Sequence, residues 1–162
     1  MIKVNVLTEE KSWSKKIKKK EFFFNQLCRH FPKKFRFINK RVYLTLLLSN
    51  NTNIKRLNKK FRKKDIHTDV LSFPLQKNFK NFKEVYLGDV IISFNYMNKP
   101  KNINNYDFKE KVTKIFIHGF LHLLNFNHIK EKEYQIMFRE EQKIFRSCND
   151  LRRGSNARNK PK

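Results

Sequence analysis

The sequence has 162 residues and a formal net charge of +24, from 38 Lys and Arg side chains against 14 Asp and Glu. This length suits one domain. Hydrophobic residues make up 39% of the chain and include 17 Phe, which is enough to form a packed core and excludes a disordered basic protein. No apolar run approaches the ~18 residues of a membrane-spanning helix, and the N-terminus lacks the apolar segment of a secretory signal. We therefore expect a cytoplasmic protein with no membrane partner.

The positive charge is concentrated near the N-terminus. Residues 1–64 carry 20 basic and 3 acidic side chains, a net charge of +17, whereas residues 65–144 carry 12 and 10. Lys outnumbers Arg 28 to 10, as in coding sequences rich in A and T, so the total charge alone does not identify a nucleic-acid partner. Its uneven distribution favours a basic face in the first 64 residues. Within it, the run KKIKKK at residues 15–20 is either a solvated surface or a stripe that follows a phosphate backbone.

The first half of the chain alternates predicted strands and helices. Residues 2–7 alternate apolar and polar side chains, as in a strand with one buried face. Thr8 then begins a helix whose apolar side chains recur at helical spacing until Pro32. A buried strand is predicted over residues 42–48, and a short helix follows it. The inner side of that short helix is expected to consist of Ile54, Leu57 and Phe61.

The second half of the chain contains two further strands and two long helices. The strands are predicted over residues 70–73 and 86–94, and an exposed hairpin connection over residues 77–84 joins them. After a polar loop, the helices are predicted over residues 108–124 and about 130–146.

No internal repeat or linker divides residues 1–146, which we expect to form a single functional domain. Residues 147–162 are polar and basic and lack apolar periodicity, so we predict a disordered C-terminal tail. The order of elements predicts an α+β fold, with a small mixed β-sheet of about four strands packed with about five helices.

Three of the five histidines lie within eleven residues, in the segment HGFLHLLNFNH. In a helix, His118 and His122 project from the same face, about 6 Å apart along the axis. His128 can return toward them if the chain leaves the helix after Leu124, and Asn125 suits the left-handed conformation that ends a helix. A catalytic zinc ion uses three protein ligands and leaves a fourth position for water. We therefore predict that His118, His122 and His128 hold one Zn²⁺ ion.

The spacing of these histidines equals that of the metzincin protease motif HExxHxxGxxH, but Gly119 occupies the position of its catalytic Glu. Without a carboxylate there, peptide hydrolysis lacks its usual general base. A protease is therefore disfavoured, whereas another kind of metal-dependent hydrolase is compatible with the sequence.

The histidine segment resembles the HGxLHLxGYDH signature of the bacterial YbeY family of metal-dependent endoribonucleases. Two further blocks agree in order and spacing: residues 57–75, LNKKFRKKDIHTDVLSFPL, are similar to that family's LNxxYRxKDxPTDVLSFP, and residues 87–93, LGDVIIS, to LGDIxIS. The resemblance covers most of residues 1–146. It implies an α+β fold and a zinc ion on the three histidines. It also implies ribosomal RNA and the small ribosomal subunit as partners, with a role in 16S rRNA 3′-end maturation and ribosome quality control.

The resemblance places Arg62 on a functionally important arginine of the family. A guanidinium offers a rigid fork of donors for a phosphate and stays charged at any relevant pH. The sequence departs from the signature at Asn125, which replaces a Gly, and at Asn127, which replaces an Asp, so no proton acceptor is assigned. His67 replaces a Pro and is either a surface residue or an added phosphate contact. Asp69 and Asp89 are expected to fix turns or strand ends, with a position within reach of the site as the alternative for either.

These observations leave competing functional hypotheses. In the first, the protein is a single-strand-specific, zinc-dependent endoribonuclease. A zinc-bound water with a pKa of about 7 attacks the phosphodiester, Arg62 stabilises the charge that develops on it, and the basic N-terminal half holds the RNA. In the second, a non-catalytic basic ribosome-assembly factor keeps a structural zinc site, which the absence of an acid at Asn127 favours. A hydrolase of small molecules or proteins is a third class, and it would bind RNA weakly at physiological salt.

Overall fold

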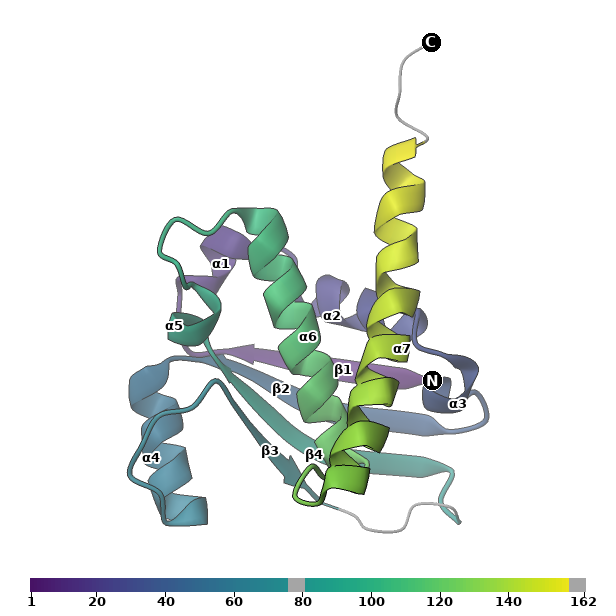
Figure 1. Cartoon of the computed structure of the whole chain (residues 1–162), viewed down its shortest axis with the longest axis horizontal. Coiled ribbons are helices and arrows are strands. Elements are labelled where there is room, and N and C mark those ends of the chain that lie inside the picture. Colours follow the sequence, from purple (N-terminus) through teal and green to yellow (C-terminus); the bar gives the residue numbers. More distant parts are fainter. Residues whose placement is uncertain (76–80, 158–162) are drawn as a thin grey trace.

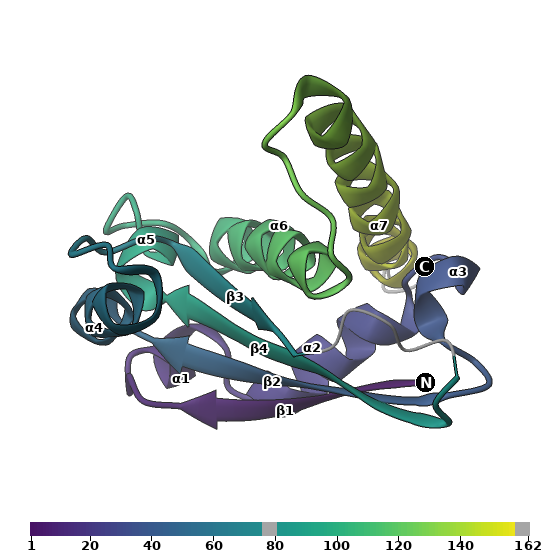
Figure 2. The ribbon, with the colours of Figure 1, turned by 90° about the horizontal axis from the view of Figure 1, so that it is seen from below.

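The computed structural model describes residues 1–75 and 81–157, which form a mixed four-stranded sheet with helices packed on it (Figures 1 and 2). The strands are β1 (Ile2–Thr8), β2 (Arg41–Ser49), β3 (Val70–Pro74) and β4 (Glu84–Ser93). Their order in the sheet is β1-β2-β4-β3, with β1, β2 and β4 parallel and β3 antiparallel to β4. The predicted α+β class and the four strands are confirmed.

Seven helices occur in the described part of the chain. They are α1 (Trp13–Lys16), α2 (Lys20–Arg29), α3 (Lys33–Arg36), α4 (Asn51–Arg62), α5 (Phe94–Met97), α6 (Asn105–Leu123) and α7 (Glu131–Ala157). The sequence predicted about five, because α3 and α5 are single turns, too short to produce a helical period, and because α1 and α2 were predicted as one continuous helix. None of the described helices is long and apolar enough to cross a lipid bilayer.

The predicted helix from Thr8 to Phe31 is interrupted in the structure. Thr8 ends β1, and the backbone is extended at Ile17, which separates α1 from α2 and buries its own side chain. The break falls within the basic run of residues 15–20, where a continuous helix would stack like charges three and four residues apart. The interruption therefore brings an apolar side chain into the core while its basic neighbours spread over the surface.

The last helix extends beyond its predicted end. α7 continues to Ala157, eleven residues past the predicted helix end at Arg146, and the Cys148 side chain is buried in the core. Helix therefore occupies the first part of the segment predicted as a disordered tail, and residues 158–162 lie outside the described residues. Residues 76–80, which contain part of the predicted hairpin connection, also lie outside them.

The main core lies between one face of the sheet and helices α1, α2, α6 and α7. Fully buried aromatic rings fill it, with Trp13, Phe24, Phe31, Phe108, Phe116 and Phe120 as the largest members. Helix α4 covers a smaller patch on the opposite face, where Ile54 packs with Leu71 and Ile91. Phe61, expected on the inner side of α4, is instead 57% exposed, because the final turn of the helix carries it to the edge strand, where its ring meets Phe73. The sheet and the core thus fix α6, which carries two of the predicted metal ligands.

Candidate metal centre

The three predicted histidine ligands meet at the C-terminal end of α6. The candidate ligand atoms of His118, His122 and His128 all lie within 4.8 Å of one another. The Nε2 atoms of His118 and His122 are 3.0 Å apart, and the His128 ring lies 5.3 Å and 5.0 Å from the rings of His118 and His122. His118 and His122 are half-buried, whereas His128 is exposed. Three convergent imidazoles with one open side can hold a metal ion, as the spacing predicted.

The end of α6 turns the chain so that His128 returns to the site. Asn125 adopts the predicted left-handed conformation, with φ of 65°. Its N–H donates to the His122 carbonyl at 2.9 Å, and the Phe126 N–H donates to the Leu121 carbonyl at 3.1 Å, the hydrogen-bond pair of a Schellman motif. The Phe126 carbonyl in turn lies 2.9 Å from Nδ1 of His122. The motif that ends the helix therefore also orients a ligand, leaving Nε2 free to face the other imidazoles.

Glu141, on the neighbouring helix α7, contacts the first ligand. Its Oε1 lies 2.6 Å from Nδ1 of His118, and both side chains are partly buried. A carboxylate on the outer nitrogen of a metal-binding imidazole fixes the ring orientation and strengthens the ligand. Sequence reasoning missed Glu141 because it lies 23 residues after His118 on another helix. The spacing of residues along α7 could have indicated it. Glu141 follows buried Met137 by four residues and precedes buried Ile144 by three, so it lies on the buried side of the helix, where a carboxylate needs a partner.

We expect Glu141→Ala to weaken zinc affinity by about 10- to 100-fold, because His118 then loses the group that orients it. Glu131→Ala is the matched control, since Glu131 is exposed on the same helix and its carboxylate contacts Gln135. Competition with a chromophoric chelator measures the affinity, and circular dichroism verifies that the helices are retained. Equal zinc affinities for the two variants would contradict the orienting role of Glu141.

The environment of His122 keeps its imidazole neutral. Burial, reinforced by the nearby His118, lowers the pKa of His122 from 6.5 to about 4, although the hydrogen bond to the Phe126 carbonyl acts in the opposite direction. A neutral imidazole has a free lone pair, which a metal ligand requires. His122 is therefore ready to coordinate an ion at neutral pH.

A pocket of about 670 Å³ opens beside the histidines, and it also contains Arg62. Arg62 donates from a terminal guanidinium nitrogen to the Ser72 carbonyl at 3.0 Å, and its guanidinium lies 5.7 Å from the Phe73 ring centroid. The side chain is thereby tethered at the pocket wall while remaining exposed. The structure brings together Arg62 and the histidines, which lie at least 56 residues apart in the sequence.

Gly119 faces the sheet. A Cβ atom at this position would lie 2.8 Å from Cγ1 of Val90 and 3.1 Å from Oγ of Ser72. The Ser72 hydroxyl also donates to the Gly119 carbonyl at 3.0 Å, which joins the helix to β3. A carboxylate at position 119 would therefore meet the packed sheet, so this position allows α6 to approach the strands.

The remaining predicted residues have separate roles. Asn127 lines the pocket but carries no acid, and among the described residues that line the pocket the carboxylate is that of Asp69. Oδ1 of Asp69 accepts from the Val70 N–H at 2.8 Å, which fixes the start of β3 as expected. His67 lies outside the pocket lining, and its Nδ1 is 2.8 Å from the Tyr96 hydroxyl. The structure thus gives His67 a protein partner on the surface.

Comparison with known proteins places the chain within a family. The family model described as "Endoribonuclease YbeY" matches residues 6–149. A relative of that name from Pelagibacter ubique (strain HTCC1062) is 57% identical over 146 residues, covering 90% of this chain and 95% of the relative. Another, from Sulfurihydrogenibium sp. (strain YO3AOP1), is 35% identical over 144 residues, covering 88% and 91%.

A solved structure shows the same fold. A Thermotoga maritima protein, determined in solution, superposes with a TM-score of 0.57 at 22% sequence identity, covering 97% of this chain and 96% of the other. The fold therefore agrees with that of a natural protein of almost the same extent. The match of the family model over residues 6–149 and the 57% identity to the Pelagibacter relative show that the chain belongs to the YbeY family.

Proposed function

We propose that this protein is a single-strand-specific, zinc-dependent endoribonuclease that acts in ribosomal RNA processing. The observation that carries this proposal is one pocket that contains three convergent imidazoles and a tethered arginine. The endoribonuclease names of the family and of its curated members support RNA as the substrate class. We further propose that the substrate is the 3′ end of the 16S rRNA precursor, presented on the small ribosomal subunit, and that the same activity serves ribosome quality control in the cytoplasm.

The donor set fits one zinc ion. His118, His122 and His128 would hold it through ring nitrogens, which are preferred zinc ligands, and two of the rings are already oriented by contacts on their other nitrogen. When bound, such an ion supplies a Lewis acid for a phosphoryl oxygen and lowers the pKa of water. The pocket leaves room for a phosphate group beside the imidazoles, since it encloses about 670 Å³.

Arg62 is placed to bind the phosphate. Its tether to the Ser72 carbonyl uses one terminal nitrogen, and the other donors of its guanidinium remain for the scissile phosphodiester. Lys64 lines the same pocket and adds positive charge. A single strand suits such a site, because its backbone and 2′-hydroxyls can enter a pocket that a rigid duplex cannot.

We expect Arg62→Ala to lower kcat for RNA cleavage by about 10²-fold and to leave zinc affinity unchanged, because Arg62 stabilises charge on the phosphate rather than holding the ion. Arg56→Ala is the matched control, since Arg56 is exposed on the same helix and does not line the pocket. Single-turnover cleavage measures the effect, and chelator competition measures the metal. A loss of zinc affinity without a loss of kcat in the zinc-saturated variant would contradict this role.

The non-catalytic hypothesis requires a closed zinc site. Structural zinc ions generally have four protein ligands, whereas catalytic ions have three and an open position. In the described residues the candidate metal cluster has three members, and it faces a pocket. This geometry favours catalysis over a purely structural role.

Cleavage of a precursor RNA by metal-free and metal-loaded protein tests the proposed function. The substrate is a single-stranded fragment that spans the 3′ end of the 16S region, and a duplex of the same sequence is the control. We expect cleavage only with the zinc-loaded protein and the single-stranded fragment. Equal cleavage by the metal-free protein would refute the metal dependence, whereas tight binding without turnover would support the assembly-factor hypothesis.

A further inference from the structure

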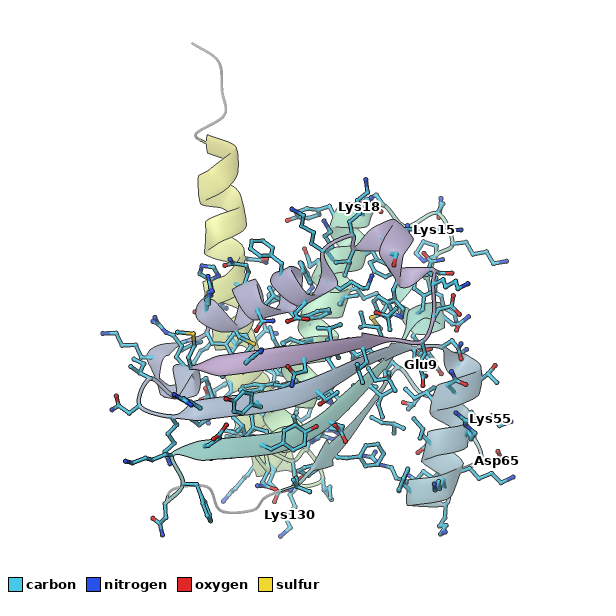
Figure 3. The ribbon with its side chains drawn as sticks, turned by 180° about the vertical axis from the view of Figure 1, so that it is seen from behind. Glu9, Lys15, Lys18, Lys55, Asp65 and Lys130 are labelled. Atoms are coloured by element: carbon cyan, nitrogen blue, oxygen red, sulfur yellow. The ribbon has the colours of Figure 1, made fainter. Side chains whose placement is uncertain are left out.

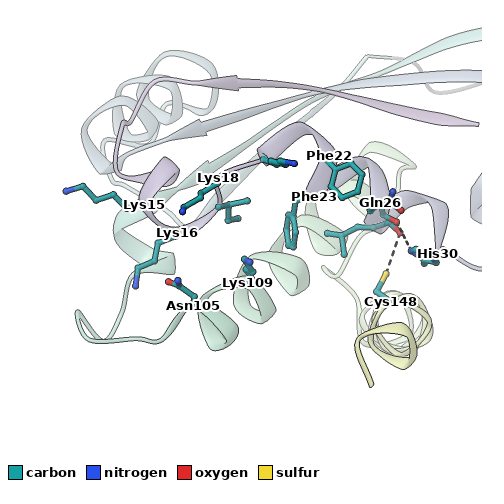
Figure 4. Close-up of a pocket in the computed structure, with 13 residues that line it drawn as sticks. Lys15, Lys16, Lys18, Phe22, Phe23, Gln26, His30, Asn105, Lys109 and Cys148 are labelled. Atoms are coloured by element: carbon teal, nitrogen blue, oxygen red, sulfur yellow. Dashed lines mark hydrogen bonds between the residues drawn. The ribbon is translucent and has the colours of Figure 1, made fainter. Parts of the chain in front are cut away.

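A second concave surface, which we call the lysine groove, lies between the α1–α2 junction and the first half of α6. It encloses about 760 Å³, and Asn105 and Lys109 of α6 form one wall (Figure 4). Its basic lining consists of Lys15, Lys16, Lys18, Lys19 and Lys109. Among the described residues that line it there is no Asp or Glu. Five ammonium groups around one concavity repel one another, so the groove is complementary to a polyanion.

The lysine groove is separate from the metal centre. Lys109 precedes His118 by nine residues on α6, or about two and a half helical turns, so the two side chains leave opposite sides of the helix about 14 Å apart along its axis. Figure 3 shows the same separation, since Lys15 and Lys18 lie at the opposite end of the molecule from Lys130, which follows His128 by two residues. A phosphate in the groove is therefore not the phosphate beside the histidines.

The lysines of the groove differ in how firmly they are held. Lys16 is half-buried, and its Nζ donates to the Ile103 carbonyl at 2.7 Å. Lys18 and Lys19 are exposed, and neither forms an ion pair with a carboxylate within the described part of the chain. Their positive charge is therefore available to an external anion.

Aromatic and polar side chains lie beside these cations. Phe22 is 62% exposed at the groove, and Phe23 is held edge-on against Phe24 with ring centroids 5.1 Å apart. Figure 4 shows Phe22 and Phe23 between the lysines at one end and His30 at the other. Aromatic faces next to a row of cations are the arrangement on which unpaired bases stack while the backbone follows the charge.

We propose that the lysine groove binds a second, single-stranded segment of the RNA substrate, away from the scissile phosphodiester. The choice of RNA rests on the proposed function, but the binding requires no metal and can be measured separately. Single strands are favoured over duplexes because only unpaired bases can stack on Phe22. The groove then raises the affinity for long substrates without entering the chemical step.

The test measures RNA affinity by fluorescence anisotropy in the presence of a chelator. The groove variant is Lys15→Gln/Lys18→Gln/Lys19→Gln, and the matched control, with the same loss of charge elsewhere on the surface, is Lys3→Gln/Lys33→Gln/Lys83→Gln. With a single-stranded RNA of about 25 nucleotides, we expect the groove variant to bind at least about tenfold more weakly. The salt slope, which is the slope of log affinity against log salt concentration, should become shallower by about 2, or about 0.7 per lost phosphate contact. The control variant should stay within about twofold of the wild type.

RNA length and stacking separate the groove from general charge. An RNA of about 3 nucleotides is shorter than the roughly 4–16 that one single-strand-binding fold covers and is too short to fill both sites, so in cleavage by the zinc-loaded protein it should have the same KM with both triple variants. For the long RNA, the groove variant should raise KM at unchanged kcat. Phe22→Ala should weaken binding of the long RNA by about tenfold and leave the salt slope unchanged, since it removes stacking alone.

Three outcomes would overturn this inference. Equal losses of affinity in the two triple variants would show that net charge alone binds RNA. An unchanged affinity in the groove variant would show that RNA does not enter the groove. Displacement of the RNA by polyglutamate as readily as by unlabelled RNA would indicate an acidic protein partner instead. Failure of metal-dependent cleavage would refute the proposed function, but it would leave these binding results interpretable.

Discussion

We expect His122→Ala to lower RNA cleavage by at least about 10³-fold, because it removes the central ligand of the candidate zinc site together with the chemistry that the ion supplies. His122 is held by the Phe126 carbonyl and lies 3.0 Å from His118 through the Nε2 atoms, so its loss leaves two imidazoles without the third. Two ligands bind zinc far more weakly than three. Zinc content by mass spectrometry should therefore fall in parallel with cleavage of the precursor fragment.

His67→Ala is the matched control for this experiment. His67 is an exposed histidine outside the pocket lining and contacts only Tyr96 through its side chain in the described structure. Its replacement should change neither zinc content nor cleavage by more than about twofold, as for a typical surface substitution. Equal activity of His122→Ala and the wild type at saturating zinc would remove the histidine cluster from the mechanism. Equal losses in His67→Ala and His122→Ala would point instead to a general effect on folding.

The second large effect is expected on stability. Gly88 lies on β4 with φ of +130°, where a Cβ atom would approach the Phe73 carbonyl oxygen to 2.1 Å and the Leu75 nitrogen to 3.0 Å. Both atoms belong to the backbone of the paired segment, so no side chain can move aside. We expect Gly88→Ala to lower the free energy of unfolding by about 3–5 kcal/mol and the Tm by about 10 °C. Thermal unfolding followed by circular dichroism measures the shift.

Gly119→Ala is the matched comparison. The nearest atom to its added Cβ is a side-chain methyl of Val90 at 2.8 Å, and the helix gains about 1 kcal/mol of propensity from Ala over Gly. We expect a net loss of only about 1 kcal/mol, since small relaxations relieve overpacking in part. If both glycine variants had the same Tm as the wild type, the tight approach of β3 to Gly88 would not exist in solution.

Local sequence signals predicted most of the metal centre. His118 and His122 are four residues apart on one helix, and Asn125 has the backbone preference that ends it, so three ligands within eleven residues could be placed together. Arg62 was predicted as a site residue through a matched sequence block, because no local rule relates it to histidines more than 50 residues away. Glu141 was missed for the same physical reason, since its contact depends on how α7 packs against α6.

The sequence was less informative about where helices begin and end. The apolar residues between positions 13 and 31 have helical spacing whether they lie in one continuous helix or in two helices separated by a break. The spacing therefore did not reveal the extended backbone at Ile17. The polar composition after Arg146 suggested a tail, yet Cys148 continues the buried stripe of Met137 and Ile144 at helical spacing. Phe61 matched the period of α4, but the last turn of that helix lies at the edge strand β3, and the ring stays exposed beside Phe73.

The contact between Glu141 and His118 links metal affinity to the packing of two helices. Because the three histidines are close in sequence, an unfolded chain can also bind zinc through them. Zinc therefore stabilises the folded state only to the extent that it binds the folded chain more tightly than the unfolded chain. Glu141 reaches His118 only when α7 lies against α6. Zinc occupancy and the docking of α7 are therefore thermodynamically coupled, so each should raise the equilibrium constant of the other by the same factor.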